Sequence, residues 1–149
     1  MNFDRVAHWW DNNPKKDMPT AAMFTSLADN CETLDPEEQS VGITHAVRLL
    51  HGTAFGSNAP ANGDRDGAWI ALLADSGAYE SAAIALIPSD ATFTGGRLAD
   101  GSFVAQVILA NGVGSHSRTA RSLSMAWLAA LLRANARAII EAEAARARN

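Results

Sequence analysis

Cysteine is nearly absent from the sequence, because Cys31 is the only one among 149 residues. A single thiol cannot close an intramolecular disulfide. The four histidines, at positions 8, 45, 51 and 116, also lack the CxxC or HExxH type of spacing that holds zinc. We therefore expect no metal, no other cofactor and a reducing, cytoplasmic location.

Long hydrophobic runs are missing as well. No apolar run approaches the roughly 18 residues of a membrane span, and the N-terminal MNFDRVAHWWDNN has acidic and amide side chains where a signal peptide is apolar. We expect no contact with a membrane. The length predicts a single domain, 1–149, with a helical part (1–52), a loop (53–67) and a part of helices and strands (68–149).

Basic side chains are few, and the net charge is −4. This balance argues against non-specific nucleic-acid binding. The charge is divided along the chain: residues 1–60 carry 4 basic and 8 acidic side chains, residues 61–110 carry 2 and 6, and residues 111–149 carry 6 and 2. The first two segments are therefore each −4, and the C-terminal segment is +4.

Apolar residues at helical spacing predict helices in the N-terminal part. A short helix is expected over Phe3 to Trp10, and a second after Thr20 as its cap. Asp35 as cap, Pro36 at the first position and Glu38 in a capping box predict a third helix that ends at Gly52. The expected apolar positions of the second and third helices are Ala21, Phe24, Leu27, Ala28, Cys31, Ile43, Val47 and Leu50.

The middle of the chain leaves one element open. Residues 66–76, with Asp66 as a cap and Trp69, Leu72 and Leu73 on one side, favour a short helix closed by Gly77, although a buried strand fits the same residues. Beyond them, turn residues separate apolar runs and predict an antiparallel meander, because Asp-Gly and Asn-Gly suit tight hairpin turns. The expected strands are Ser81 to Ile87, Thr92 to Leu98, Phe103 to Ala110 and a short fourth at Val113 to His116.

A long helix is predicted at the C-terminal end, from Thr119 or Arg121 to near Ala145. Apolar residues surround more than half of its circumference, so we expect it to lie between the sheet and the N-terminal helices. The predicted fold class is α+β, with N-terminal helices, a three- to four-stranded antiparallel meander and a long C-terminal helix packed on the sheet. The apolar positions of this helix are Leu123, Met125, Trp127, Leu128, Leu131, Leu132, Ile139 and Ile140.

Cationic side chains at the start of that helix suggest an anion site. Arg118 and Arg121 oppose the helix dipole there, and a bound phosphate or carboxylate would relieve that cost. The candidate ligands are Ser115, His116, Ser117, Arg118, Thr119 and Arg121. In the alternative interpretation Ser117 or Thr119 caps the helix, and the arginines pair with carboxylates from the acidic part of the chain.

Catalytic patterns are weak. Ser115 and His116 are adjacent in sequence, which rarely permits the hydrogen bond of a nucleophile to its base, and no GxSxG motif is present. Most aspartates of the middle region stand in turn contexts. We therefore expect a non-enzymatic protein. Trp9 and Trp10 lie about 100° apart on a short helix, which predicts one exposed ring that anchors a protein partner or a second copy; in the alternative interpretation both rings cover the core.

The segment from Ala91 to Ala134, a strand hairpin that leads into SLSMAWLAALLRA, resembles the closing strand-helix unit of small phage and prophage proteins of unknown function. Ser124 and Ala129 depart from the pattern of that family, which often has proline and a basic residue there. The matching positions are Ser122, Met125, Ala126, Trp127, Ala130, Leu131 and Leu132.

Two functions follow as expectations. The resemblance implies a phage or prophage accessory protein, and such a protein would bind a macromolecular partner, for example to counter a host defence, through Trp9 and Trp10 or through its acidic surface. The alternative is a small-ligand binder that holds a phosphorylated molecule or nucleotide at the start of the C-terminal helix.

Overall fold

A computed structural model describes residues 19–55 and 61–148, with side chains described outside residues 51–66. The helix expected over Phe3 to Trp10 lies outside the described residues. The elements are α2 (Ala21–Thr33), the 3-10 helix η1 (Pro36–Glu38), α3 (Gln39–Phe55), α4 (Ala61–Asp75), α5 (Tyr79–Leu86), β1 (Thr92–Arg97), β2 (Phe103–Ile108), β3 (Gly114–His116) and α6 (Leu123–Arg148).

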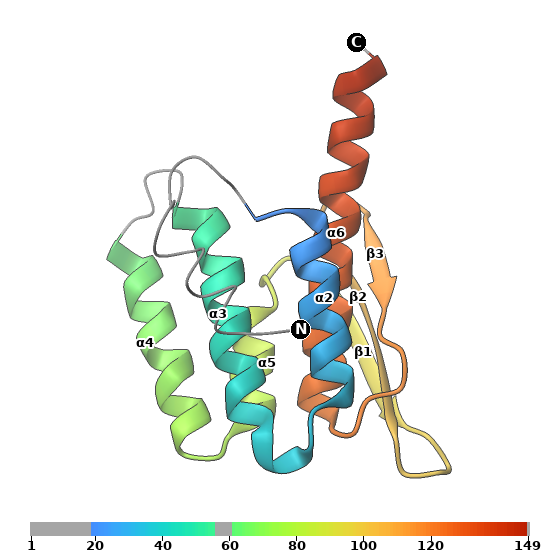
Figure 1. Cartoon of the computed structure of the whole chain (residues 1–149). Coiled ribbons are helices and arrows are strands. Elements are labelled where there is room, and N and C mark those ends of the chain that lie inside the picture. The colour runs from blue at the N-terminus through green and yellow to red at the C-terminus, as the bar shows by residue number, and fades with distance from the viewer. Residues whose placement is uncertain (1–18, 56–60, 149) are drawn as a thin grey trace.

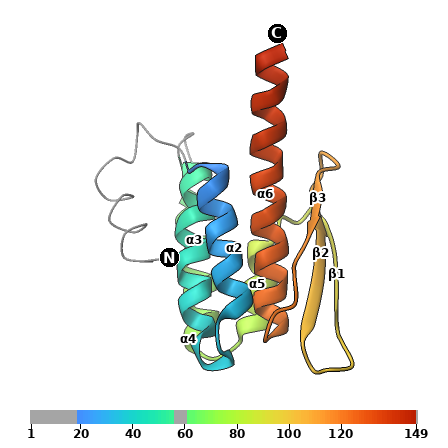
Figure 2. The same cartoon turned by 45° about the vertical axis from the view of Figure 1, so that its right-hand side comes forward.

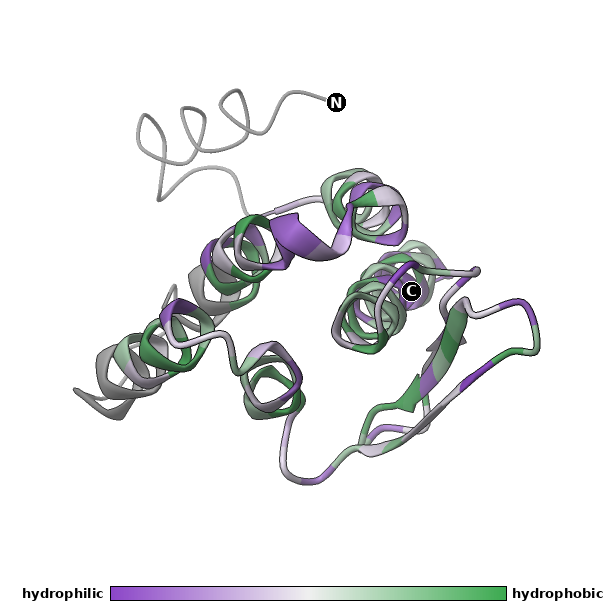
Figure 3. Ribbon diagram, turned by 90° about the horizontal axis from the view of Figure 1, so that it is seen from below, coloured by the Kyte–Doolittle hydropathy of each residue, from purple (hydrophilic) through white to green (hydrophobic). Residues whose placement is uncertain are grey.

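These elements form three layers, which confirms the α+β class. Helices α2, α3 and α4 stand in a row, α5 and α6 form a second layer, and the sheet lies against α6 (Figures 1 and 3). Helix α6 packs on α2 and α5 on one side and on all three strands on the other. Figure 2 shows that no described helix covers the outer face of the sheet. The C-terminal helix thus takes the predicted place between the sheet and the N-terminal helices.

The sheet is an antiparallel meander in the order β1-β2-β3. Phe93 pairs with Val107 and Gly95 with Ala105, so these four residues share the face towards α6. The turns fall at the predicted dipeptides, where Gly101 and Gly112 both have φ of 90°. Only glycine adopts such angles readily, which explains why the turn prediction was correct.

The strand predicted over Ser81 to Ile87 is wrong, because this segment belongs to the helix α5. Its buried residues are Ala82, Ala83 and Leu86, a helical spacing along one side. The alanines in this segment fit the apolar positions of a strand as well as those of a helix, so the sequence pattern did not distinguish the two. The sheet therefore has three strands in the described residues. The short strand that was predicted as the fourth, Val113 to His116, corresponds to β3.

The connection predicted at 53–67 is also largely wrong. Helix α3 continues through Gly52 to Phe55, and α4 begins at Ala61. The helix favoured over 66–76 is confirmed as the C-terminal part of α4. Asp35 makes no capping hydrogen bond with its side chain, which pairs with Arg121 instead.

Helix α6 begins at Leu123, two residues after the later of the two predicted starts. Ser122 is its cap, since the Ser122 hydroxyl accepts from the Met125 N–H at 3.4 Å. By length and composition alone this helix could cross a membrane, but 56% of its most apolar window is buried inside the fold. A helix covered by α2, α5 and the sheet in this way is the core helix of the molecule.

Helix α2 follows its prediction closely. The Thr20 side chain accepts from the Met23 N–H, and Phe24, Leu27 and Cys31 are buried against α6. Burial raises the pKa of the Cys31 thiol to about 12, with a smaller contribution from the neighbouring Glu32 carboxylate.

Cys31 should therefore be inert towards thiol reagents while the protein is folded. At pH 8 a group with a pKa of about 12 has a thiolate fraction on the order of 10⁻⁴, and only the thiolate reacts. We expect no labelling by a disulfide reagent in native buffer and one equivalent in denaturant. Complete native labelling within minutes would show that α2 separates readily from α6.

Gly95 marks a close approach between the sheet and α6. A Cβ atom at this position would lie 2.7 Å from Nε1 of Trp127 and 3.1 Å from Cδ1 of Leu123. The indole packs edge-on against Phe93, with ring centroids 5.7 Å apart. Its buried Nε1 has no hydrogen-bond partner among the described residues, so the indole is held by packing alone.

Gly95→Ala should destabilise the protein, because the new methyl group must displace Trp127 or the strand. We expect a loss of about 1–3 kcal/mol in the free energy of unfolding, measured by denaturant titration. Gly96→Ala is the matched control, since a Cβ there meets nothing within 4 Å. It should be neutral or gain up to about 1 kcal/mol. Equal losses in the two variants would contradict the close packing at Gly95.

Candidate functional site

The structure places Ser115, His116 and Ser117 along the end of β3, where they do not converge. Ser115 pairs with Val107, whereas His116 pairs with Gln106 and so lies on the opposite face of the sheet. The buried Ser117 hydroxyl accepts from the Ala105 N–H at 2.7 Å. Ser117 therefore fastens the chain to β2 after β3 ends.

Arg118 and Arg121 lie beside the acidic end of α2. The Arg118 side chain is 3.8 Å from Asp29, and that of Arg121 pairs with Asp35. These pairs confirm that part of the alternative interpretation in which the arginines meet carboxylates from the acidic part of the chain. Its other part is wrong, since Ser122 caps α6 in place of Ser117 or Thr119. Both arginine side chains remain more than half exposed, at 76% and 59%, so each pair contributes little to stability.

Thr119 and Arg121 line an open groove of about 660 Å³ at the base of the molecule. The opposite wall is the β1–β2 turn, where the Asp100 carboxylate accepts from the hydroxyl and N–H of Ser102 at 2.6 and 2.9 Å. These bonds lower the pKa of Asp100. Glu32 also lines the groove, but its carboxylate is buried and paired, so the groove presents the Asp100 carboxylate and an Arg121 guanidinium that already pairs with Asp35. This charge does not favour a phosphate.

A buried ion pair lies behind these arginines. The Glu32 carboxylate accepts from Nη2 and Nε of Arg133 at 2.6 and 3.3 Å, and from the Arg118 N–H at 2.6 Å. The side chains are only 5% and 13% exposed. The hydrogen bond that Arg133 donates to Glu32 is the main reason that the pKa of Arg133 is raised. This cluster joins α2, α6 and the segment between β3 and α6.

The groove offers no evident catalytic arrangement. Ser102 and Thr119 are its hydroxyls near the turn and α6, and no histidine or cysteine lines it. Among the described side chains, those of residues 19–50 and 67–148, no group of three or more histidine, cysteine or acidic residues could hold a metal ion. The structural role of Glu32 and Arg133 accounts for the buried charges here.

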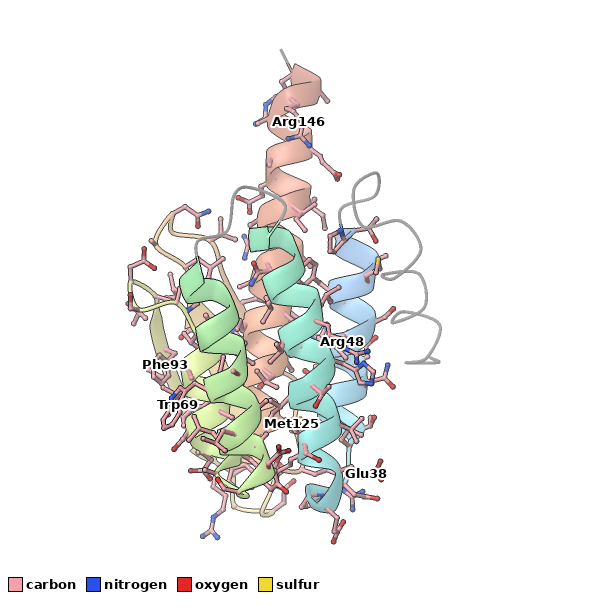
Figure 4. The ribbon with its side chains drawn as sticks, turned by 90° about the vertical axis from the view of Figure 1, so that its left-hand side faces the viewer. Glu38, Arg48, Trp69, Phe93, Met125 and Arg146 are labelled. Carbon is pink, nitrogen blue, oxygen red and sulfur yellow. The ribbon has the colours of Figure 1, made fainter. Side chains whose placement is uncertain are left out.

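A second surface was missed as a candidate in the sequence. Trp69 and Leu72 on α4 are 55% and 59% exposed, the two highest values among the large apolar side chains of α4. Figure 4 shows Trp69 on the side of α4 that faces away from α3. Ile70 and Ala74 fill the buried side of the same helix. The apolar arc of α4 is thus wider than the part that α3 and α5 cover, and this excess width was the signal in the sequence.

An acidic residue borders this surface, which we call the α4 face (Ala68, Trp69, Ala71 and Leu72). Asp75 lies one turn beyond Leu72 on the same helix and is exposed. Trp9 and Trp10, predicted as partner anchors, lie outside the described residues.

Comparisons with protein-family models, curated proteins and solved structures found no match.

The buried pair makes a sharp prediction for stability. Glu32→Ala should cost about 2–3 kcal/mol, because it leaves Arg133 with only the half-exposed Asp29 carboxylate, at 2.6 Å, and removes the acceptor of the Arg118 N–H. The double variant Glu32→Ala with Arg133→Met should recover part of this loss in a double-mutant cycle. Glu141→Gln is the control: it breaks the exposed pair with Arg137 and should cost less than about 0.5 kcal/mol. A Glu32→Ala loss as small as that of the control would contradict the structural role of the cluster.

Proposed function

We propose that this protein is a non-enzymatic binding protein that recognises another protein through the α4 face. The observation that carries this proposal is the exposure of Trp69 and Leu72, at 55% and 59%. Tryptophan is the residue type most enriched among those that dominate binding energy at interfaces. A tryptophan beside a leucine on one helix turn gives a partner a compact apolar anchor.

The border of the face specifies the kind of partner. Asp75 is exposed and acidic, and no ion pair involves it among the described residues. The surface therefore suits a protein with an apolar pocket ringed by lysine or arginine. Such complementary charge speeds association and makes it sensitive to salt.

The resemblance to small phage and prophage proteins of unknown function implies an accessory protein. An accessory protein that binds a host protein, for example to counter a host defence, fits this mode of action. A cytoplasmic location fits it too. The phosphorylated-ligand alternative remains a prediction with less support, since Arg118 and Arg121 already pair with carboxylates and the groove beside them carries Glu32 and Asp100.

Trp69→Ser with Leu72→Ser should abolish capture of the partner without loss of the fold. We expect a protein retained by the immobilised wild type from lysate of the native host to be lost with this variant. With that partner purified, the dissociation constant should rise at least about 30-fold, as for interface residues worth 2 kcal/mol or more. Binding should also weaken as salt is raised.

Val41→Ser is the matched control, because Val41 is an exposed apolar residue on a different helix, at 39%. It should capture the same partner with unchanged affinity. The proposal fails if the α4 variant binds the purified partner as tightly as the wild type, or if no purified candidate binds the wild type saturably.

A further inference from the structure

The outer edge of β1 carries backbone groups without partners. Phe103 exchanges hydrogen bonds with Ala120, and Ala105 accepts from the Ser117 N–H, so these two residues of β2 face away from β1. Since antiparallel strands alternate, residues 104 and 106 face β1, where they pair with Gly96 and Thr94. The N–H and C=O groups of Phe93, Gly95 and Arg97 therefore point outward, and no described residue bonds to them.

This edge lacks the features that usually prevent pairing with another chain. Strand β1 contains no proline and no lysine, and its register with β2 runs through six residues without a bulge. Its one charged residue, Arg97, is exposed and makes no ion pair with a described residue. Gly95, Gly96 and Arg97 are all exposed, so a second strand has room to approach.

The helical layer above the sheet is wider than the sheet. Helix α6 contacts all three strands, whereas α5, its neighbour in the same layer, packs on α3, α4 and α6 (Figure 3). The space between α5 and β1 is an apolar groove of about 520 Å³. It is lined by residues 84–89, Ala91 and Phe93. Ile84, which points into this groove, is 39% exposed. The helical layer therefore leaves space for a further strand alongside the outer edge of β1, on the side of the sheet that faces α5.

We propose that this place is taken by β1 of a second copy of the chain, in an antiparallel pair about a two-fold axis. The residues that pair across the axis are those whose backbone groups point outward in each copy. With Gly95 opposite Gly95, the two strands pair over residues Thr92 to Leu98. It sets Phe93 of each copy opposite Arg97 of the other, on the face towards the helices.

This register is self-complementary in chemistry. The unpaired Arg97 guanidinium meets an aromatic ring, a favourable cation–π arrangement, and its aliphatic stem covers the apolar groove. The exposed Leu98 meets Thr92 of the second copy. Two three-stranded sheets become one sheet of six, a usual size, and α5 of each copy covers the neighbouring β1.

The oligomeric state tests this proposal. Sedimentation velocity from about 1 to several hundred micromolar should show the wild type as a dimer in reversible equilibrium with the monomer. Hydrogen exchange at the amides of Phe93, Gly95 and Arg97 should slow as the dimer forms. Arg97→Pro should remain monomeric, because proline removes the backbone N–H that residue 97 would donate to the second copy. The hydrogen bonds between β1 and β2 are unaffected, since that N–H points away from β2.

Three further variants make the outcome specific. Arg97→Glu, which keeps the strand intact, should weaken dimerisation at least about tenfold and carries the test if Arg97→Pro fails to fold. Gly96→Ala is the control, because its backbone groups face β2 and its Cβ meets nothing within 4 Å. Trp69→Ser with Leu72→Ser should also leave the dimer intact, which separates this surface from the α4 face. A monomer at every concentration, or a dimer unchanged by Arg97→Glu, overturns the proposal.

Discussion

The structure depends on one constraint: α6 is apolar around most of its circumference and must be covered on every side. Between Ser124 and Ala136 it supplies ten buried residues. Helix α2 covers one side, α5 another and the sheet a third, so the order of the layers follows from the composition of a single helix. The small residues of the strands serve the same need, because Gly95 leaves the space that Trp127 fills.

The charge division along the sequence has a structural meaning. The basic C-terminal segment and the acidic N-terminal segment meet in a group of ion pairs. Asp29 and Glu32 of α2, with Asp35 just beyond it, face Arg118, Arg133 and Arg121. Acidic and basic side chains from distant segments of the chain thus form ion pairs within one molecule. Arg118 and Arg121, which precede α6, are placed by their partners across the layers rather than by the helix dipole, which opposes them.

Sequence reasoning was most accurate where local chemistry decides the structure. The turns at Gly101 and Gly112 and the cap at Thr20 were predicted because backbone angles and side-chain bonds fix them within a few residues. It failed for α5, where alanines are compatible with helix and strand, and contacts with α3, α4 and α6 decide. The pairing of Arg121 with Asp35 spans 86 residues, and no local pattern encodes such a distance. The α4 face was visible only as an apolar arc, because its exposure depends on where neighbouring helices stop.

Helix α6 continues beyond the layers that cover it, and every residue from Ile140 to Arg148 is exposed (Figure 1). Its alanines and its Arg137–Glu141 pair maintain the helix there without tertiary support. At 1.5 Å per residue these nine residues form a rod about 13 Å long. A fluorophore or spin label on this rod would report the orientation of the whole molecule, because the rod and the core share one continuous backbone.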